Sequence, residues 1–398
     1  MRNAVFMRIL YDHQVFSLQD TGGISRYHYE LVKGLQVFED LQIELLIGGN
    51  ASVLPLTMLR NAQTRVTAWK TRTQPGYARY AINEALLSLL APLCQKLDVY
   101  HPTLNRTMPA VRSRRIVVTQ HDCTHERFPH LFRNTEAFIR IKRKILSMAD
   151  AILCVSQFSR QDLLHFYDVD EAKTHVVHHG FSPLEEEDPA LKPIDPLSTP
   201  PVDPYLLYVG SRTDYKNFKL LLEAYAQGGL AEGYRLVAVG GGPSSAAEET
   251  RITQLGVAGR VCLMPRASDP ALAELYRNAS LFVYPTLYEG FGFPPLEAMS
   301  LGCPVLANRT SSIPEVCGKA AFYFQSQEPA ELAAALISTL QDVEGLREKR
   351  RLGYEQVRLY DWSRTARRTL EVYAGCAPHS GDPQSRASIG VAGSPAPR

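Results

Sequence analysis

Short apolar runs rich in Val, Ile, Leu and Tyr alternate along the chain with longer amphipathic stretches. A strand buried on both faces reads as a continuous apolar run, whereas a helix that covers a sheet repeats its apolar positions every three to four residues. The alternation therefore predicts parallel sheets covered by helices on both faces. In the first half of the chain, strands are expected at Arg8–Tyr11, Ile43–Ile47, Val99–His101, Ile116–Thr119, Ile152–Val155 and His175–Val177, with helices at Ile24–Leu35, Tyr77–Leu90, Thr135–Met148 and Gln157–Phe166.

The pattern breaks once and then restarts. Residues 181–204 contain seven prolines, three consecutive glutamates and no usable periodicity, which predicts an exposed linker between domains. We therefore predict an α/β protein of two Rossmann-like, doubly wound parallel-sheet domains, at residues 1–181 and 205–376, joined by a linker at 182–204. In the second domain, strands are expected at Tyr205–Val209, Leu236–Val239, Val261–Leu263, Leu281–Tyr284, Val305–Ala307 and Ala321–Phe324, with helices at Asn217–Ala226, Ala271–Asn278, Pro295–Leu301 and Pro329–Leu340.

The end of the chain divides into two parts. Helical periodicity continues over about Val343 to Ala374, and the final helix is a candidate to return to the first domain. Residues 377–398 are rich in Ser, Ala, Gly and Pro, so we expect them to be disordered and without function.

The composition of the chain excludes several classes of protein function. The 398 residues are 45% hydrophobic and carry a formal charge of +2, which is typical of a globular protein and too small to favour nucleic-acid binding by bulk electrostatics. Seven cysteines without a Cys-x-x-Cys motif argue against a disulfide framework and a zinc site. The chain shows no signal peptide and no membrane span, so a cytoplasmic location is expected.

The most informative loop follows the strand at Leu281–Tyr284. There, Glu289 and Glu297 flank a loop with two glycines, Gly290 and Gly292, and a helix is expected to open at Pro294 or Pro295. Backbone N–H groups in such a loop, beside a helix N-terminus, can dock an anion or a sugar hydroxyl, and the two carboxylates can accept hydroxyls of a sugar and a ribose. Taken singly, each is better explained as a solvated loop charge or as a residue that complements the helix dipole.

A second loop follows the first strand of the second domain. Gly210 permits a tight turn, after which Arg212 and Lys216 precede a helix, an arrangement suited to clamping a diphosphate. The alternative is a solvated basic turn that pairs with Asp214.

These residues together resemble a known family. Glu289 and Glu297 match the Glu-x7-Glu signature of retaining glycosyltransferases of family 4, and Gly210 to Asn217 resembles that family's Gly-x-Arg…Lys-Asn phosphate loop. The resemblance covers about residues 7–362, and includes the segments 11–16, 22–27, 119–122 and 149–156. It implies the GT-B fold, in which two Rossmann-like domains face a central cleft.

The resemblance implies catalytic roles for four residues. Arg212 and Lys216 would hold the donor diphosphate, and Glu289 would hold the donor sugar. His121, at the end of a strand of the first domain, looks like the family's histidine that reaches the reacting sugar across the cleft. Without the resemblance, His121 is as well explained as a histidine that caps a strand end.

The resemblance also implies five binding residues. Glu297 would bind the ribose, and the amides of Phe291 and Gly292 would contact the donor sugar. Gly22 and Gly23 look like the loop that lets backbone approach the phosphates or the acceptor.

Two other motifs are better explained by a structural role than by metal binding. His178 and His179 resemble the family's hinge at the end of the first domain, and adjacent side chains in an extended segment point in opposite directions, which is unsuited to a metal pair. Asp168 and Asp170 imitate an Asp-x-Asp metal motif but lie in a polar loop away from any strand end.

Two further segments are candidates for ligand contacts. The glycines at 240–242 follow a strand and can line a nucleotide, a signal too common to specify more. The basic run Arg140 to Lys144 is expected to be a solvated helix face, or else to contact anionic lipid headgroups at the inner membrane if the acceptor is membrane-anchored.

The sequence favours a retaining glycosyltransferase that moves a hexose, with mannose or a related sugar as the first candidate, from a nucleotide-diphosphate sugar to a saccharide or lipid-linked saccharide in polysaccharide biosynthesis. We expect no cofactor and no metal. Two alternatives stay open: a nucleotide-sugar 2-epimerase of the same architecture, and a non-catalytic two-domain sugar-binding protein.

Overall fold

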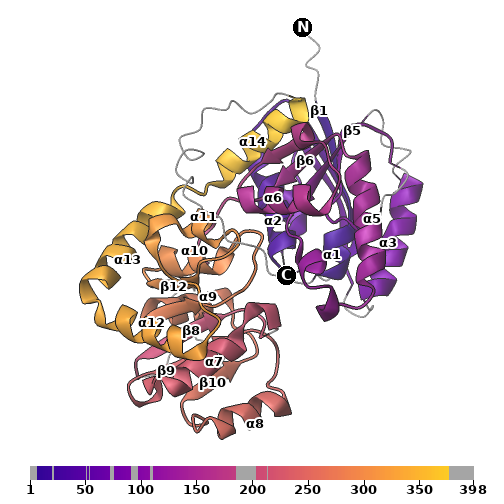
Figure 1. The fold of residues 1–398 in the computed structure, drawn as a ribbon. Coiled ribbons are helices and arrows are strands. Elements are labelled where there is room, and N and C mark those ends of the chain that lie inside the picture. Colours follow the sequence, from indigo (N-terminus) through magenta and orange to yellow (C-terminus); the bar gives the residue numbers. More distant parts are fainter. Residues whose placement is uncertain are drawn as a thin grey trace.

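The protein consists of two α/β domains (Figure 1). The computed structural model describes residues 7–19, 22–50, 52, 54–71, 76–90, 97–107, 111–184, 203–212 and 214–375. Most of the predicted linker, residues 185–202, and the whole predicted tail at 377–398 lie outside the described residues.

The first domain is built on a seven-stranded parallel sheet with the strand order β3-β2-β1-β4-β5-β6-β7. Its strands are β1 (Met7–Tyr11), β2 (Leu41–Asn50), β3 (Thr64–Lys70), β4 (Leu97–His101), β5 (Ser113–Gln120), β6 (Ala151–Cys154) and β7 (Thr174–Val176). The order reverses between β1 and β4, and the carboxyl ends of strands beside such a reversal are where open parallel sheets bind ligands.

The second domain repeats this topology with six parallel strands in the order β10-β9-β8-β11-β12-β13. They are β8 (Tyr205–Val209), β9 (Arg235–Val239), β10 (Val261–Met264), β11 (Leu281–Tyr284), β12 (Val305–Asn308) and β13 (Ala321–Phe324). The reversal here lies between β8 and β11. Two doubly wound parallel sheets, as predicted, are confirmed.

Helices cover both faces of the first sheet. They are α1 (Gln14–Leu18), α2 (Gly23–Leu35), α3 (Gly76–Leu90), α4 (Thr124–Arg127), α5 (Thr135–Met148) and α6 (Gln157–Phe166). α2 packs on the face that carries Ile9 and Val117. α3 packs on the opposite face with Leu10, and α5 and α6 pack there with Val118.

The second sheet is covered in the same way. Its helices are α7 (Phe218–Gln227), α8 (Ala246–Gln254), α9 (Asp269–Asn278), α10 (Phe293–Ser300), α11 (Ile313–Cys317), α12 (Pro329–Gln341) and α13 (Val343–Val357). Leu221 of α7 and Leu336 of α12 lie in one core cluster. Tyr276 of α9 and Leu296 of α10 lie in another, on the opposite face.

The last helix, α14 (Trp362–Ala374), lies on the first domain, where Figure 1 shows it in yellow. Trp362 joins the core of that domain, and the hydroxyl of Tyr373 lies 2.7 Å from that of Tyr11. The chain therefore passes between the domains twice. The two passages meet, since the backbone N–H of Phe181 donates to the carbonyl of Tyr360 at 3.1 Å.

Several elements differ from the sequence prediction. The strand β3 and the helices α1, α4, α8 and α11 were not predicted, and the helical stretch 343–374 is two helices separated at residues 358–361. Within the described ranges, no helix combines the length and the apolar character needed to cross a membrane.

Candidate active site

The strand order of the second domain brings together the two loops that carry its candidate functional residues. The loop after β8 contains Lys216 and the loop after β11 contains Glu289, and these strands are neighbours in the sheet. The Lys216 ammonium lies 2.6 Å from Oε1 of Glu289, and Tyr284 donates its hydroxyl to the same oxygen at 2.6 Å. Burial lowers the pKa of Lys216, but the attraction of Glu289 and Tyr215 outweighs it and the net shift is upward. Lys216 is therefore a cation held at the reversal point.

Side chains from the next loop fix the backbone around Glu289. Its N–H donates to Oγ of Ser311 at 2.9 Å, while the Ser312 hydroxyl contacts the carbonyls of Glu289 and Phe291 at 2.9 and 2.6 Å. Gly292 then precedes α10 with a φ of 126°, a conformation that favours glycine. The loop is thus positioned before any ligand arrives.

Arg212 is not part of a solvated basic turn, and the described residues show no ion pair between it and Asp214. Its Nε donates to Glu248 of α8 at 2.6 Å, and its other nitrogens donate to the carbonyls of Gly240, Gly242 and Pro243. The side chain is only 3% exposed. The guanidinium therefore holds the glycine turn to α8, and it can reach a ligand only by exchanging these partners.

Glu297 lies on α10 and faces the first domain. Tyr276 donates its hydroxyl to Glu297 at 3.1 Å. Burial raises the pKa of Glu297 to about 6, while the positive charge of Arg26 and the hydrogen bond from Tyr276 act against that rise. Because Arg26 belongs to α2, a charge of the first domain reaches this carboxylate across the junction.

His121 follows β5 directly and is enclosed by aromatic rings. Its ring lies 5.2 Å from Tyr27 and 5.6 Å from His179 between centroids. Its Nε2 is buried and has no hydrogen-bond partner among the described residues. Burial lowers the pKa of His121 to about 4, although Asp122 opposes the shift. A neutral imidazole with an unsatisfied nitrogen is suited to a ligand hydroxyl, because a buried polar atom without a partner is costly.

The two domains touch beside His121. A Cβ at Gly290 would overlap the carbonyl oxygen of His121, so only glycine permits this approach. Ser156 of the first domain donates to the Gly290 carbonyl at 2.7 Å, and the Cys123 N–H donates to the Tyr288 hydroxyl at 2.6 Å. The glycine loop of the second domain therefore lies directly against the strand end that carries His121.

The glycines at the start of α2 complete the junction. Gly22 is the N-cap of α2. A Cβ at Gly23 would lie 3.9 Å from the ring of Phe293, the first residue of α10. The N-termini of α2 and α10 therefore face the same place. The helix dipoles at both ends favour a negatively charged ligand there, although Pro294 and Pro295 leave Phe293 as the N–H donor in the first turn of α10.

Two family models match the chain. One, described as glycosyl transferases group 1, matches residues 194–356, and the other, described as glycosyltransferase family 4, matches residues 21–183. The two matches correspond to the two domains. The chain is a glycosyltransferase with the GT-B fold.

Individual relatives agree with this assignment. The glycosyltransferase is 27% identical to the O-antigen chain mannosyltransferase B of Escherichia coli, over 88% of this chain and 95% of that one. It shares the fold of sucrose-phosphate synthase from Thermosynechococcus elongatus, with a TM-score of 0.69 and 20% identity over 93% and 98% of the chains. Anabaena HepE in complex with UDP and glucose superimposes with a TM-score of 0.66 and 17% identity over 92% and 99%.

The glycosyltransferase brings two of the predicted residues into direct contact. Lys216 pairs with Glu289, while Arg212 pairs with Glu248 of the same domain. Sequence reasoning missed Tyr284 and Arg26. Tyr284 is the last residue of β11, and Arg26 follows the glycine pair by one turn, so both positions carried a signal.

The adjacent histidines of the glycosyltransferase face different partners. His178 lies 2.6 Å from Glu315 of α11, and His179 stacks on Phe293 with ring centroids 5.2 Å apart. Asp170 caps a short helical turn by accepting from the N–H of Ala172. Within the described part of the chain, no cluster of three or more His, Cys, Asp or Glu is placed to hold a metal.

The basic run of α5 is not a uniformly solvated face. Lys142 is 3% exposed and lies 2.8 Å from Glu126, whereas Arg140 and Lys144 are exposed. The run therefore divides between the interior and the surface.

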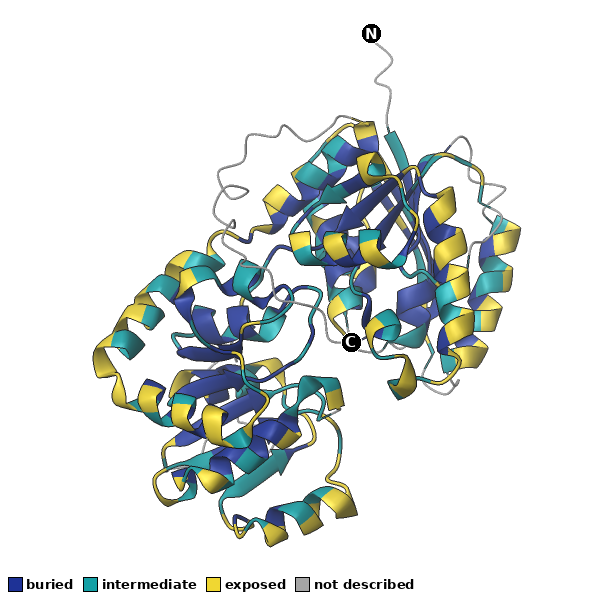
Figure 2. Cartoon of the chain, in the orientation of Figure 1, coloured by how far each residue is buried: buried dark blue, intermediate teal, exposed yellow. Residues whose placement is uncertain are grey.

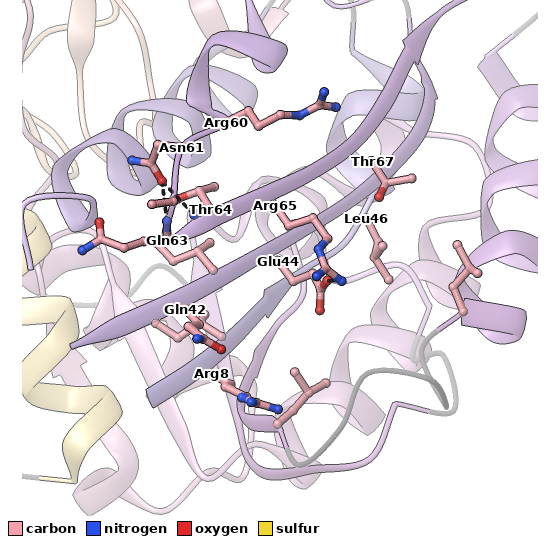
Figure 3. A pocket seen from close by; sticks show the side chains of 15 residues that line it. Arg8, Gln42, Glu44, Leu46, Arg60, Asn61, Gln63, Thr64, Arg65 and Thr67 are labelled. Carbon is pink, nitrogen blue, oxygen red and sulfur yellow. Dashed lines mark hydrogen bonds and ion pairs between the residues drawn. The ribbon is translucent and has the colours of Figure 1, made fainter. Parts of the chain in front are cut away.

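A hollow of about 700 Å³ lies on the face of the first sheet that α3 partly covers (Figure 3). Arg8, Gln42, Glu44 and Arg65 line it, and Arg65 lies 3.1 Å from Glu44. Because Arg8 and Gln42 lie near the amino ends of β1 and β2, the hollow is remote from the carboxyl ends where these sheets bind ligands. It is not the candidate active site.

Proposed function

We propose that the protein transfers a hexose, with mannose as the first candidate, from a nucleotide-diphosphate sugar to a saccharide or lipid-linked saccharide acceptor in polysaccharide biosynthesis, with retention of anomeric configuration. The name of the E. coli relative, an O-antigen chain mannosyltransferase, supports the choice of sugar and pathway class. The UDP and glucose held by Anabaena HepE support a nucleotide-sugar donor.

One observation carries the proposal. The Lys216–Glu289 pair lies at the strand reversal of the second domain, and the glycine loop that follows it abuts the strand end bearing His121. A cation, a carboxylate and a neutral imidazole thereby border one junction. A donor has matching parts: an anionic diphosphate, a hydroxyl-rich sugar and a reacting carbon that must be kept from water.

In the proposed reaction, Lys216 and the positive end of the α10 dipole hold the diphosphate and stabilise charge that develops on its leaving oxygen. Glu289 accepts hydroxyls of the sugar, and Glu297 accepts hydroxyls of the ribose. His121 contacts the sugar from the first domain. Arg212 joins the diphosphate after exchanging Glu248 for it.

No protein nucleophile takes part in this scheme. The bond from the anomeric carbon to the leaving phosphate oxygen breaks, and a bond to the acceptor hydroxyl oxygen forms on the same face, which retains configuration. The departing phosphate oxygen takes the acceptor proton. Closely packed domains exclude the water that would otherwise hydrolyse the donor.

The proposed donor and acceptor also suggest where in the cell the enzyme works. We propose that the enzyme works in the cytoplasm, and at the inner membrane when its acceptor is lipid-linked. We propose no cofactor and no metal, because side-chain and backbone donors supply the positive charge.

The test begins with donor identity. A thermal-shift panel of GDP-, UDP-, ADP- and dTDP-sugars should identify one nucleotide that raises the melting temperature, since a ligand that binds only the native state stabilises it. The selected donor is then incubated with and without acceptor. Transfer that requires an acceptor supports the proposal. Conversion of the sugar without an acceptor indicates an epimerase, and binding without turnover indicates a sugar-binding protein.

A further inference from the structure

Buried residues of each domain gather mainly in its own sheet and on the sides of the helices that face it (Figure 2). Tyr288 departs from this pattern, because it belongs to the second domain but lies in a core cluster of the first. It is 2% exposed, and Val118 of β5 and Ile145 of α5 are members of the same cluster. A large ring buried in the neighbouring domain restricts how the two domains can be arranged, because protein cores are closely packed.

Both the ring and the hydroxyl of Tyr288 have partners in the first domain. The rings of Phe128 and Phe158 meet it edge to face, with centroids 6.1 and 6.0 Å away. The Arg127 guanidinium carbon lies 5.5 Å from the centroid of the Tyr288 ring. The Cys123 N–H donates to the Tyr288 hydroxyl at 2.6 Å. The site therefore specifies tyrosine, since phenylalanine would leave the buried Cys123 N–H without its acceptor.

Phe128 contacts the second domain at another ring as well. It stacks on Tyr215, with centroids 5.6 Å apart and ring planes 26° apart. Tyr215 precedes Lys216, whose ammonium lies 5.3 Å from the centroid of the Tyr215 ring. The Leu287 N–H donates to the Tyr215 carbonyl at 2.8 Å. The loops after β8 and β11 are therefore joined to each other, and both rest on Phe128.

Two contacts of one short segment enclose Glu289. On one side of it in the sequence, Tyr288 holds the N–H of Cys123. On the other side, Gly290 lies against the carbonyl of His121. The segment of the second domain that carries the candidate sugar-binding carboxylate thus lies beside the segment of the first that carries the candidate histidine. A displacement of Tyr288 would therefore move Glu289 relative to His121.

We propose that Tyr288 is a positioning residue for glycosyl transfer and that Phe128 supports it: together they align Lys216 and Glu289 with His121 across the junction. The inference rests on the roles of these three residues in the proposed function, and Tyr288 itself contacts no reacting atom. A misplacement of about 1 Å at a reacting centre can cost about a hundredfold in rate.

Misalignment would also change the fate of the donor. A donor that the second domain still binds, but that is not enclosed by the first, is open to water. In that side reaction the oxygen of water bonds to the anomeric carbon, the bond to the phosphate oxygen breaks, and one water proton passes to the phosphate. The share of donor that is hydrolysed therefore reports on alignment.

The experiment compares three variants of the full chain with the donor and acceptor identified above. We expect Tyr288→Phe to lower the kcat of transfer about tenfold, and Tyr288→Ala and Phe128→Ala to lower it about a hundredfold. In each variant the hydrolysed share of the donor should rise, and the affinity for the free nucleoside diphosphate should stay within about threefold of wild type. Because the two rings act together, Tyr288→Ala with Phe128→Ala should lose little more than either alone.

Two matched controls remove similar groups away from the junction. Tyr225 of α7 donates its hydroxyl to the carbonyl of Tyr234 at 2.8 Å, within the second domain. Phe38 is half-buried in the first domain and precedes the amino end of β2. Tyr225→Phe and Phe38→Ala should keep the wild-type kcat and the wild-type hydrolysed share, even where they lower the melting temperature.

Two results would overturn the inference. One is a lower melting temperature with wild-type kcat and hydrolysed share in the Tyr288 and Phe128 variants, which would make the rings merely stabilising. The other is impaired transfer in Tyr288→Phe with wild-type kinetics in Phe128→Ala, which would place Tyr288 on the substrate.

Hydrogen exchange separates this inference from the proposed function, because it needs no turnover. The Cys123 amide should exchange slowly in the wild type and about tenfold faster or more in Tyr288→Phe, which lacks its acceptor. That difference in a wild type that transfers no sugar would contradict only the proposed function. Normal transfer by all three variants of an active enzyme would contradict only this inference.

Discussion

The two sides of the domain junction differ in charge. The second domain contributes Lys216, Glu289 and Glu297, and the first contributes His121 within a cluster of buried rings. Burial, together with neighbouring histidines, holds the pKa of His179 well below its ordinary value, so the histidine rings of this side are uncharged near neutral pH, while its cation Arg26 acts on Glu297. Charges act more strongly beside a surface of low polarity than in water. The comparison teaches that the second domain supplies most of the charges proposed to act on the donor, and that the first supplies buried rings that strengthen their effect.

The largest expected effect follows removal of the cation on the charged side. Lys216→Ala should lower turnover by about a thousandfold or more, because the leaving diphosphate loses its principal counter-charge. Steady-state kinetics with the identified donor and acceptor would measure it. Lys219→Ala, an exposed lysine of α7, is the matched control and should keep wild-type turnover. Undiminished turnover in Lys216→Ala would contradict the proposed role.

Glu289→Ala should cost about a hundredfold or more in turnover, because the sugar loses a hydroxyl acceptor and Lys216 loses its partner. Binding of the free nucleoside diphosphate, measured by calorimetry, should stay within a few-fold of wild type. Glu274→Ala, an exposed carboxylate of α9, serves as control. Equal losses of nucleotide binding and turnover would place Glu289 at the diphosphate instead.

A single added carbon atom at Gly290 can break the contact between the two domains. Gly290→Ala would place a Cβ against the His121 carbonyl, so the domains must separate locally. We expect at least about a tenfold loss in kcat/KM, since the histidine no longer reaches the sugar. Gly233→Ala, at a position where a Cβ meets nothing, is the control. Wild-type kinetics for Gly290→Ala would show that this approach of the domains is dispensable.

The pKa of Glu297 predicts opposite pH effects on binding and stability. Ribose hydroxyls need the ionised carboxylate, so donor affinity should fall as pH drops below about 6, by about tenfold at pH 5. Since burial raises this pKa above its usual 4.5, the folded state binds more protons than the unfolded one, and Glu297 lowers the free energy of unfolding as pH rises from 4.5 to 6.

Glu297→Gln should therefore bind the donor with little dependence on pH in this range and should be more stable than wild type at pH 7. Calorimetric titrations and urea denaturation at several pH values test both parts. A pH profile of affinity identical to that of wild type would exclude Glu297 as the titrating group.

The smallest effect concerns Arg212. If Glu248 competes with the donor for this guanidinium, Glu248→Gln should lower KM for the donor a few-fold and leave kcat nearly unchanged. An increased KM would show instead that Glu248 positions Arg212 for the donor.

The sequence predicted the long buried elements better than the exposed ones or than short helices such as α1 and α11, which span five residues each. β3 lies at the edge of its sheet, and Arg65, Trp69 and Lys70 are exposed, so its apolar signal is weak. Ile252 is the only buried residue of α8, which leaves no amphipathic period to detect. Its capping box at Ser245 and Glu248 was the available signal.

The same difference explains the site predictions. Lys216 and Glu289 follow neighbouring strands of one sheet, so their proximity could be anticipated from topology. The partner of Arg212 lies on α8, which was not predicted, and this prevented recognition of the Arg212–Glu248 pair. The contact of Gly290 with His121 depends on how two domains are oriented, which no local pattern encodes.

The hydrogen bond between Phe181 and Tyr360 ties the two interdomain passages at one point. A single connecting segment would let the two domains twist and shift in many directions, whereas two segments joined at one point leave mainly a rotation about an axis through that point. Product release would then need only this rotation, and the two faces of the junction would return to the same alignment for the next turnover.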